Sequence, residues 1–309
     1  MGKGMPDILW TGDVSFLKKL LMNINNILAW AAGNLRDTGN IKERIMRSYD
    51  GDLTPVMNDY DEYGWKHYEK IADELLRDLD VNGKYVLDIG CGTGISTLKL
   101  LEKGARKVCA TDISEYMLKA LKKKIETSDC SNDRVDLKVA DAEDLPFEDN
   151  VFDSVVSSMV LGMVPDPRKM ISGMKRVVKP GGTIALSVHG PKHYAELPDA
   201  VLAVVPKRFA MGHRFFYWPR GPEKVKDYLG SSGLTDIRIE RSTWQDTYGT
   251  SREMYEFITS STGEFYASFL PDEYLDTFRN DIRRYFENRN IHRITLDVVY
   301  AFGRKNGRI

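Results

Sequence analysis

Apolar residues follow two different periodicities along this chain. Between residues 84 and 188, short apolar runs of strand length alternate with segments whose apolar residues recur at helical spacing. The expected strands cover residues 85–88, 108–111, 135–139, 154–157 and 183–188. Strands that alternate with helices in this way form a parallel sheet covered on both faces, and the polar alternation of 135–139 suits an edge of that sheet. This part of the chain therefore predicts a doubly wound α/β core.

The pattern loosens on the C-terminal side of this core. Residues 189–222 are rich in proline, and a helix at 223–229 and a strand at 237–240 then resume the sheet pattern. A second helix follows Pro271, and the last strand is expected at 296–302. We therefore expect the core to comprise residues 65–242 and 294–309, with residues 243–293 inserted to cover a pocket.

Residues 1–64 predict an N-terminal helical cap. Residues 16–31 carry apolar side chains on one helical face, with Asp13 and Gly33 suited to cap the two ends. This helix could pack on the body or in a dimer interface, form a lid over an apolar substrate, or lie on a membrane surface. Residues 34–60 are polar and turn-rich, and the next helix is expected over 64–79.

The first predicted strand leads directly into a glycine-rich turn. The run reads Asp88-Ile89-Gly90-Cys91-Gly92-Thr93-Gly94, and a helix begins near Ser96. Glycine permits a sharp turn and lets a ligand approach the backbone closely. Dinucleotide-binding folds use a similar turn, but the Lys and Ser/Thr of phosphate-cradling loops are missing here. The carboxylate of Asp88 suits a cationic ligand better than a pyrophosphate.

This turn resembles motif I of the class I S-adenosylmethionine-dependent methyltransferases, in which an acid precedes three alternating glycines. Asp88, Gly90, Gly92 and Gly94 match that motif. Further matching segments extend the resemblance over residues 84–188, and it is closest to the small-molecule methyltransferases of quinone and sterol type. It implies a seven-stranded Rossmann-like sheet whose last strand is antiparallel. It also implies S-adenosylmethionine as the cofactor and S-adenosylhomocysteine as its product.

Acids at later strand ends match the cofactor contacts of this family. Ligands of open α/β sheets bind at the carboxyl ends of the strands. Asp112 ends the second strand at about the 20-residue spacing expected of an acid that binds the ribose hydroxyls, and it could also cap the next helix. The segment from Ala140 to Phe147 resembles the family's Asp-Ala-x-x-Leu-Pro-Phe sequence, in which the acid and the next amide bind adenine. Asp141 and Ala142 occupy those positions.

The resemblance thus implies a set of cofactor contacts along the chain. The set is Tyr63, Asp88, Gly90, Cys91, Gly92, Thr93, Gly94, Asp112, Ile113, Met117, Asp141, Ala142, Glu143 and Ser157. Tyr63 lies in a Tyr-Asp segment that often folds over the cofactor in relatives, and it could instead anchor the cap helix.

Candidate acceptor-binding residues follow the fourth and fifth strands. Residues 157–163 form an apolar, methionine-rich wall without the tetrapeptide of nucleic-acid amino-methyltransferases or the glutamate pair of protein arginine methyltransferases. His189 and His193 could take a proton from the acceptor during catalysis, or remain surface spectators. The aromatic run at 213–218 could line the acceptor pocket or fasten the insertion to the core. This pattern favours a small, partly apolar acceptor.

The composition excludes few functions but agrees with this interpretation. The 309 residues carry a net charge of -1, which gives no reason to expect strong binding to nucleic acid or anionic membranes. Cys91, Cys109 and Cys130 form no C-x-x-C pair, which favours a reducing, cytoplasmic setting. The sequence shows no secretory signal and no apolar stretch of about 18 residues. A monomer or a homodimer is expected.

The favoured function is methyl transfer from S-adenosylmethionine to an oxygen, carbon, nitrogen or sulfur atom of a small acceptor. No His, Asp and Glu cluster at metal-ligand spacing stands out in the sequence, so the reaction is predicted to be metal-independent. Two alternatives stay open. A methyltransferase acting on a protein side chain or RNA could use the basic helix at 279–293. A non-catalytic protein of the same fold would bind the cofactor without transferring its methyl group.

Overall fold

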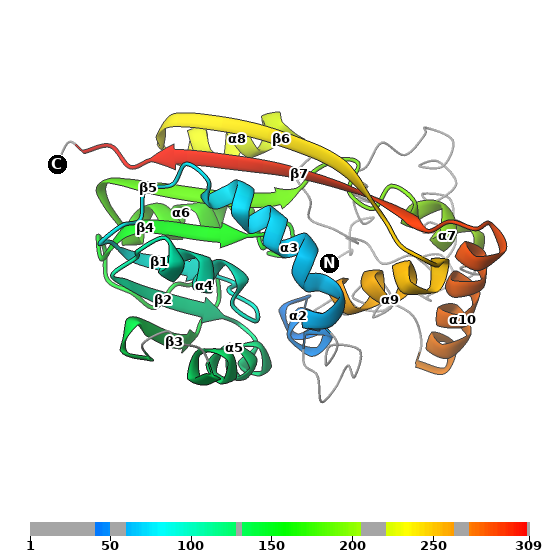
Figure 1. Ribbon diagram of the computed structural model, residues 1–309. Coiled ribbons are helices and arrows are strands. Elements are labelled where there is room, and N and C mark those ends of the chain that lie inside the picture. Colours follow the sequence, from blue (N-terminus) through cyan, green and yellow to red (C-terminus); the bar gives the residue numbers. More distant parts are fainter. Residues whose placement is uncertain (1–40, 50–59, 128–131, 205–220, 263–271, 308–309) are drawn as a thin grey trace, which may run out of the picture.

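The computed structural model describes residues 41–49, 60–127, 132–204, 221–262 and 272–307. Within them a seven-stranded sheet has the order β3-β2-β1-β4-β5-β7-β6 (Figure 1). Its strands are β1 (Tyr85–Ile89), β2 (Lys107–Asp112), β3 (Val135–Val139), β4 (Phe152–Ser158), β5 (Val178–His189), β6 (Thr235–Thr247) and β7 (Arg293–Arg304). β7 runs antiparallel to both of its neighbours, whereas the other pairings are parallel. The predicted fold class, with an antiparallel last strand and β3 at an edge, is confirmed.

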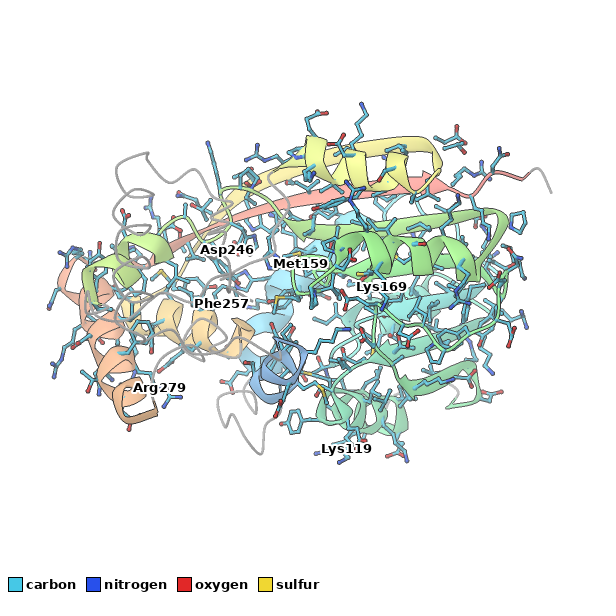
Figure 2. The ribbon with its side chains drawn as sticks, turned by 180° about the vertical axis from the view of Figure 1, so that it is seen from behind. Lys119, Met159, Lys169, Asp246, Phe257 and Arg279 are labelled. Carbon is cyan, nitrogen blue, oxygen red and sulfur yellow. The ribbon has the colours of Figure 1, made fainter. Side chains whose placement is uncertain are left out.

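Helices cover both faces of this sheet (Figures 1 and 2). One face carries α3 (Tyr60–Leu76), α4 (Ile95–Glu102) and α5 (Glu115–Thr127), and the other carries α6 (Pro167–Val177) and α8 (Pro222–Ser231). Successive strand residues point to opposite faces. Val86 is therefore buried in one cluster with Leu75 of α3, and Leu87 in another with Met170 of α6. Because both faces are covered, apolar residues of the central strands point to both sides of the sheet.

β6 and β7 continue beyond the end of β5 as a two-stranded ribbon. β5 last pairs with β7 at His189 and Val298, whereas β6 and β7 stay paired as far as Thr247 and Arg293. Three helices gather at this end, namely α7 (Leu197–Val204), α9 (Ser251–Thr262) and α10 (Asp272–Asn288) (Figure 1). They share a separate hydrophobic cluster with the ribbon. We call α7, α9, α10 and ribbon residues 243–247 and 293–297 the accessory module.

Several predicted boundaries differ from the structure. The polar, turn-rich segment 34–60 contains the helix α2 (Ile41–Ser48), which was not predicted as a separate element. α3 begins at Tyr60 rather than at residue 64, because the Tyr-Asp segment forms its first turn. The predicted boundary between core and insertion at residue 242 lies inside β6, because the ribbon carries that strand into the accessory module.

Other predictions fall outside the described residues. These are the N-terminal helix at 16–31, the aromatic run at 213–218, Cys130 and the side chain of Tyr63. None of the described helices combines the length and the apolar character that crossing a membrane requires.

Candidate active site

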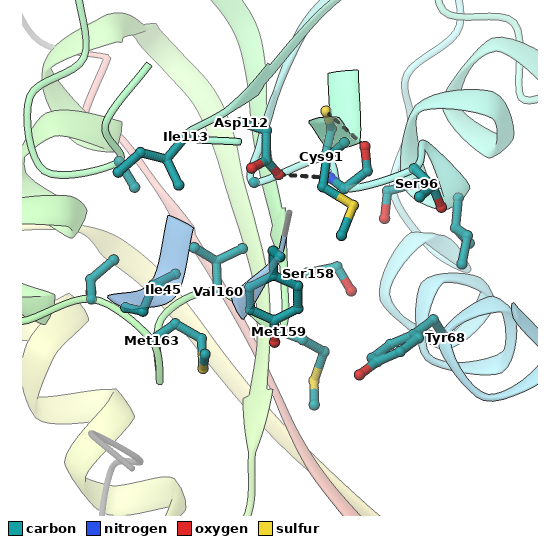
Figure 3. Close-up of a pocket in the computed structure, with 18 of the residues that line it drawn as sticks. Ile45, Tyr68, Cys91, Ser96, Asp112, Ile113, Ser158, Met159, Val160 and Met163 are labelled. Atoms are coloured by element: carbon teal, nitrogen blue, oxygen red, sulfur yellow. Dashed lines mark hydrogen bonds between the residues drawn. The ribbon is translucent and has the colours of Figure 1, made fainter. Parts of the chain in front are cut away.

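A cavity of about 170 Å³ lies at the carboxyl ends of β1, β2 and β4 (Figure 3). Its walls come from the glycine turn after β1, the ends of β2 and β4, and the segment after β3. Residues of α2 and α3 close it from the opposite side. This is the position at which doubly wound sheets bind their ligands.

All three glycines of the turn have a left-handed backbone. Their φ angles are 66° at Gly90, 54° at Gly92 and 100° at Gly94. A Cβ atom at Gly90 would lie 2.2 Å from Val160, and one at Gly94 would lie 2.2 Å from Leu121. A Cβ atom at Gly92 would meet no described atom within 4 Å, and Gly92 lines the cavity. The turn therefore packs tightly at its ends and leaves room for a ligand at its centre.

Two backbone N–H groups fix the carboxylate of Asp112 at the end of β2. Oδ2 accepts a hydrogen bond from the N–H of Gly92 at 2.9 Å (Figure 3). Oδ1 accepts one from the N–H of Ser114, also at 2.9 Å. Burial raises the pKa of Asp112 against the opposing effect of these hydrogen bonds. A carboxylate offers about four acceptor positions. The oriented carboxylate can therefore still accept hydrogen bonds from ligand hydroxyls.

Asp88 lies behind the turn at the end of β1, with 1% of its surface exposed. Its Oδ2 accepts a hydrogen bond from the Thr97 hydroxyl at 2.7 Å. Its Oδ1 is buried and has no hydrogen-bond partner among the described residues. Burial raises the pKa of Asp88 to about 7, with Thr97 opposing and Asp112 assisting this shift. A nearby cationic group of a ligand would stabilise the ionised form of this buried carboxylate.

Asp141 and Glu143, in the segment after β3, share a lysine from α2. Nζ of Lys42 forms ion pairs with both carboxylates. Oδ1 of Asp141 also accepts a hydrogen bond from the backbone N–H of Glu143 at 2.9 Å. The Glu143 carboxylate accepts one from the backbone N–H of Asp166, the residue before α6. Lys42 was not among the residues predicted from the sequence, because no separate helix was assigned to residues 41–48. The helical spacing of Ile41, Ile45 and Tyr49 is the signal that could have revealed it.

The other end of the cavity is apolar and aromatic. It is lined by Ile45, Tyr60, Tyr68, Met159, Val160, Met163 and Tyr194. The rings of Tyr60 and Tyr68 stack with their centroids 5.7 Å apart. Met159 and Tyr194 have φ angles of 63° and 53°, and such left-handed conformations of non-glycine residues cluster at functional sites. The methionine-rich segment after β4 therefore does form a wall of the cavity.

His189 lines this end of the cavity, and His193 lies behind it. The two ring centroids are 4.5 Å apart, and Nδ1 of His193 lies 2.8 Å from the carbonyl oxygen of Asp297. Burial and the neighbouring His193 lower the pKa of His189 well below its usual range. Burial, against the effect of Asp297, lowers the pKa of His193 to about 4. Both imidazoles are therefore neutral near pH 7.

Most of the residues predicted from the sequence line this cavity. They are Gly90, Cys91, Gly92, Thr93, Asp112, Ile113, Met117, Asp141, Ala142 and His189. Asp88, Gly94, Glu143, Ser157 and His193 are not part of the lining. The Ser157 hydroxyl, for example, donates a hydrogen bond to the carbonyl oxygen of Ile89 at 2.9 Å and so links β4 to β1. In the described part of the chain, His, Cys, Asp and Glu side chains form no group of three that could hold a metal ion.

Known proteins resemble this chain in sequence. The methyltransferase domain family matches residues 87–186. A demethylmenaquinone methyltransferase from Bacillus cereus is 30% identical over 222 residues, which span 66% of this chain and 90% of the relative. A demethylmenaquinone methyltransferase from Clavibacter sepedonicus is 42% identical over 106 residues, which span 34% of this chain and 41% of that relative.

Solved structures share the fold at low sequence identity. The YcgJ protein from Bacillus subtilis superimposes with a TM-score of 0.56 at 16% identity, over 78% of this chain and 99% of its own. Phosphoethanolamine N-methyltransferase 2 from Haemonchus contortus, in complex with phosphomonomethylethanolamine and S-adenosylhomocysteine, gives a TM-score of 0.55 at 18% identity. That match covers 88% of this chain and 61% of the other.

The match to the Bacillus cereus relative covers 90% of that protein at 30% identity, and the family match covers the glycine turn and the strand ends that line the cavity. The chain belongs to the class I S-adenosylmethionine-dependent methyltransferases. It is an enzyme, and S-adenosylmethionine is its cofactor.

Proposed function

We propose that this enzyme transfers the methyl group of S-adenosylmethionine to a small, partly apolar acceptor without a metal ion. The division of the cavity supports this most directly. Figure 3 shows Asp112 on one side of the cavity and Met159, Met163 and Tyr68 on the other, and the neutral His189 also lines the cavity. A charged nucleoside cofactor suits the first end, and an uncharged acceptor suits the second.

The acidic end offers partners for each part of the cofactor. Asp112 would accept hydrogen bonds from the ribose hydroxyls, and Asp141 and the N–H of Ala142 would bind the adenine edge. Gly92 would let the ligand approach the backbone, because a side chain is absent there. The unpartnered Oδ1 of Asp88 would favour the positive charge of the ligand's amino group.

When bound, S-adenosylmethionine supplies an electrophilic methyl carbon attached to a sulfonium sulfur. The residues of this chain would hold the acceptor in line with that carbon and exclude water. His189 is neutral, so a ring nitrogen could take the proton from an acceptor hydroxyl as the new bond forms. His193 does not line the cavity, and we assign it to positioning His189 rather than to contact with the acceptor.

A quinol-type acceptor is the first that we propose. The relative aligned over 90% of its length is named a demethylmenaquinone methyltransferase, and the wall of Met159, Met163 and Ile45 suits an apolar molecule. The RNA alternative depends on the basic helix α10. There Arg279 pairs with Asp276 and Arg283 with Glu287 on the same helix, which favours a small acceptor.

Calorimetry and a methyl-transfer assay test the proposal. S-adenosylhomocysteine should bind saturably, and radiolabelled methyl groups should pass to demethylmenaquinone in its reduced form, in the presence of EDTA, but not to phosphoethanolamine or RNA. His189→Ala should keep the binding of S-adenosylhomocysteine and lose about 10²- to 10⁴-fold in turnover. Transfer to RNA alone, or binding without transfer to any acceptor in a broad panel, would count against it.

A further inference from the structure

Helix α2 lies across the acidic end of the cavity. Figure 1 shows it below the start of α3, between α5 and α9. Lys42, Ile45 and Tyr49 of this segment line the cavity. The backbone carbonyl of Tyr49 accepts a hydrogen bond from the Ser114 hydroxyl at 2.9 Å. α2 therefore extends from Asp141 at one strand end to the neighbourhood of Asp112 at another.

Lys42 is the polar attachment at the Asp141 end of this helix. Its ammonium contacts the carboxylates of Asp141 and Glu143, and Glu143 in turn accepts the N–H of Asp166 at the start of α6. The Glu143 side chain is only 4% exposed, whereas that of Lys42 is 32% exposed. Partial burial opposes the charge on Lys42, but both carboxylates outweigh it and raise the pKa of Lys42. The ammonium thus stays charged and joins α2 to the segment after β3.

The loss of this ammonium would leave two carboxylates without their shared cation. Glu143 is buried, so its charge would lack compensation, and Asp141 would face it from two residues away. Removing one partner of a buried ion pair costs much more than removing an exposed one. The contacts of Ile45 and Tyr49 and the hydrogen bond from Ser114 to the Tyr49 carbonyl would not replace this ion pair at the Asp141 end.

We propose that Lys42 is a positioning residue that holds α2 closed over the adenosyl end of the cofactor site and thereby slows the release of S-adenosylmethionine and S-adenosylhomocysteine. This inference rests on the proposed placement of the adenosyl group against Asp112 and Asp141. Lys42 need not compete with the adenine amino group. A carboxylate has about four acceptor positions. Among the described contacts, the Asp141 carboxylate accepts hydrogen bonds from Lys42 and from the N–H of Glu143, which leaves positions for the adenine amino group.

Binding of S-adenosylhomocysteine to variants of the full chain tests this role. Lys42→Met should raise both the dissociation constant and the dissociation rate constant about tenfold, which corresponds to about 1.4 kcal/mol. Lys42→Arg should restore tight binding, because a guanidinium can bridge two carboxylates. Hydrogen exchange of the α2 amides in the bound protein should be faster in Lys42→Met than in the wild type.

Lys99→Met is the matched control. Lys99 of α4 also bridges two carboxylates, Glu69 and Asp73 of α3, but it does not line the cavity. Its substitution should change the affinity by less than about twofold, because it is remote from the ligand. Thermal melts would show that both methionine variants are folded.

The outcomes separate this inference from the proposed site. If Asp112→Ala leaves the affinity for S-adenosylhomocysteine unchanged, the placement of the cofactor is wrong. If Asp112→Ala weakens binding but Lys42→Met binds as tightly as the wild type or more tightly, only the role of Lys42 is overturned. An equal loss of affinity in Lys42→Met and Lys99→Met would also overturn it, because the effect would then be general.

Discussion

At the scale of single residues, the glycines of the turn after β1 fulfil two different requirements. Gly90 and Gly94 sit where a Cβ atom would overlap Val160 and Leu121, whereas Gly92 faces open space beside the cavity. All three have a positive φ, which costs other residues about 1 kcal/mol or more. The same local motif thus serves packing at its ends and ligand access at its centre.

Alanine substitutions should separate these two requirements. Gly94→Ala should lower the free energy of unfolding by about 2–4 kcal/mol, because overpacking adds to the backbone strain. Gly92→Ala should cost only about 1 kcal/mol in stability but weaken the binding of S-adenosylhomocysteine strongly. Chemical denaturation and calorimetry measure the two effects. Equal stability losses in both variants would contradict this assignment.

Asp88 should make the stability of the ligand-free protein depend on pH. Its pKa of about 7 lies above that of an unfolded-chain aspartate, so the folded state binds a proton more readily. Its contribution to stability is therefore complete below about pH 4 and is lost as the pH rises to about 7. Asp88→Asn should be more stable than the wild type at pH 8 by up to about 4 kcal/mol, and the difference should shrink towards pH 5. Thermal melts across this range test it, and a constant difference would argue against a raised pKa.

The sequence placed residues at the cavity where they stand at a strand end. Asp112 and Asp141 were placed at the cavity because the carboxyl ends of neighbouring parallel strands meet at one edge. Lys42 was missed, because its partners lie about a hundred residues away and no local pattern links them. His193 was predicted at the site because it follows β5 closely. In the structure His189 lines the cavity, whereas His193 packs against His189 and does not line it.

At the scale of elements, the ribbon of β6 and β7 depends on a buried carboxylate. Asp297 of β7 is fully buried. Its oxygens accept hydrogen bonds from Arg241 at 2.8 and 2.7 Å, from Thr243 at 2.9 Å and from the N–H of Lys192 at 2.7 Å. Burial opposes the charge of Asp297, but these partners outweigh it and lower its pKa. The cluster ties the ribbon to the segment between His189 and His193.

Arg241→Met should therefore destabilise the protein more than a surface substitution on the same strand. We expect the free energy of unfolding to fall by about 2–3 kcal/mol. This is less than the usual cost of breaking a buried ion pair, because the Arg241 side chain is about one-third exposed. The control is Arg238→Met, because Arg238 of β6 pairs at the surface with Asp78 and Glu240. It should cost less than about 1 kcal/mol. Denaturant unfolding compares the two, and similar losses would refute a special role for Asp297.

Element prediction was accurate in the core and poor in the segments that flank the cavity. The core strands are apolar because both faces are covered, so their pattern identifies them directly. α2 has only eight residues, and its polar side includes the lysine that pairs with Asp141. Most residues of β6 alternate between half-buried and exposed, so the apolar signal ended before the strand did.

At the scale of the whole molecule, the hydrophobic clusters on the two faces of the sheet and the cluster of the accessory module meet at the cavity. Phe257 of α9 belongs to the accessory cluster and is fully buried. Its ring packs against His67 of α3 at 3.9 Å between centroids and against Tyr194, which lines the cavity, at 6.1 Å. The accessory module is therefore placed to shape the acceptor end rather than the acidic end.

Phe257→Leu should raise the acceptor KM by about three- to tenfold and leave the dissociation constant of S-adenosylhomocysteine within twofold of the wild type. Phe278→Leu is the control, because Phe278 of α10 lies in the same cluster. Neither phenylalanine lines the cavity, but Phe257 packs against Tyr194 of the cavity wall. Each should cost about 1–2 kcal/mol in stability. The KM is measured with the acceptor that the transfer assay identifies. A matching rise of KM in both variants would mean that module stability alone controls the acceptor site.

The sequence by itself determined the doubly wound core, the glycine turn and the acids at the strand ends. These features depend on local periodicity and on residues close together in the chain, so each segment carries its own signal. Only the tertiary structure decided what faces those acids, namely α2 with Lys42, the tyrosines of α3, and the accessory module at the far end. These contacts join distant segments through individual side-chain pairs, and neither hydrophobic pattern nor motif spacing encodes such pairs.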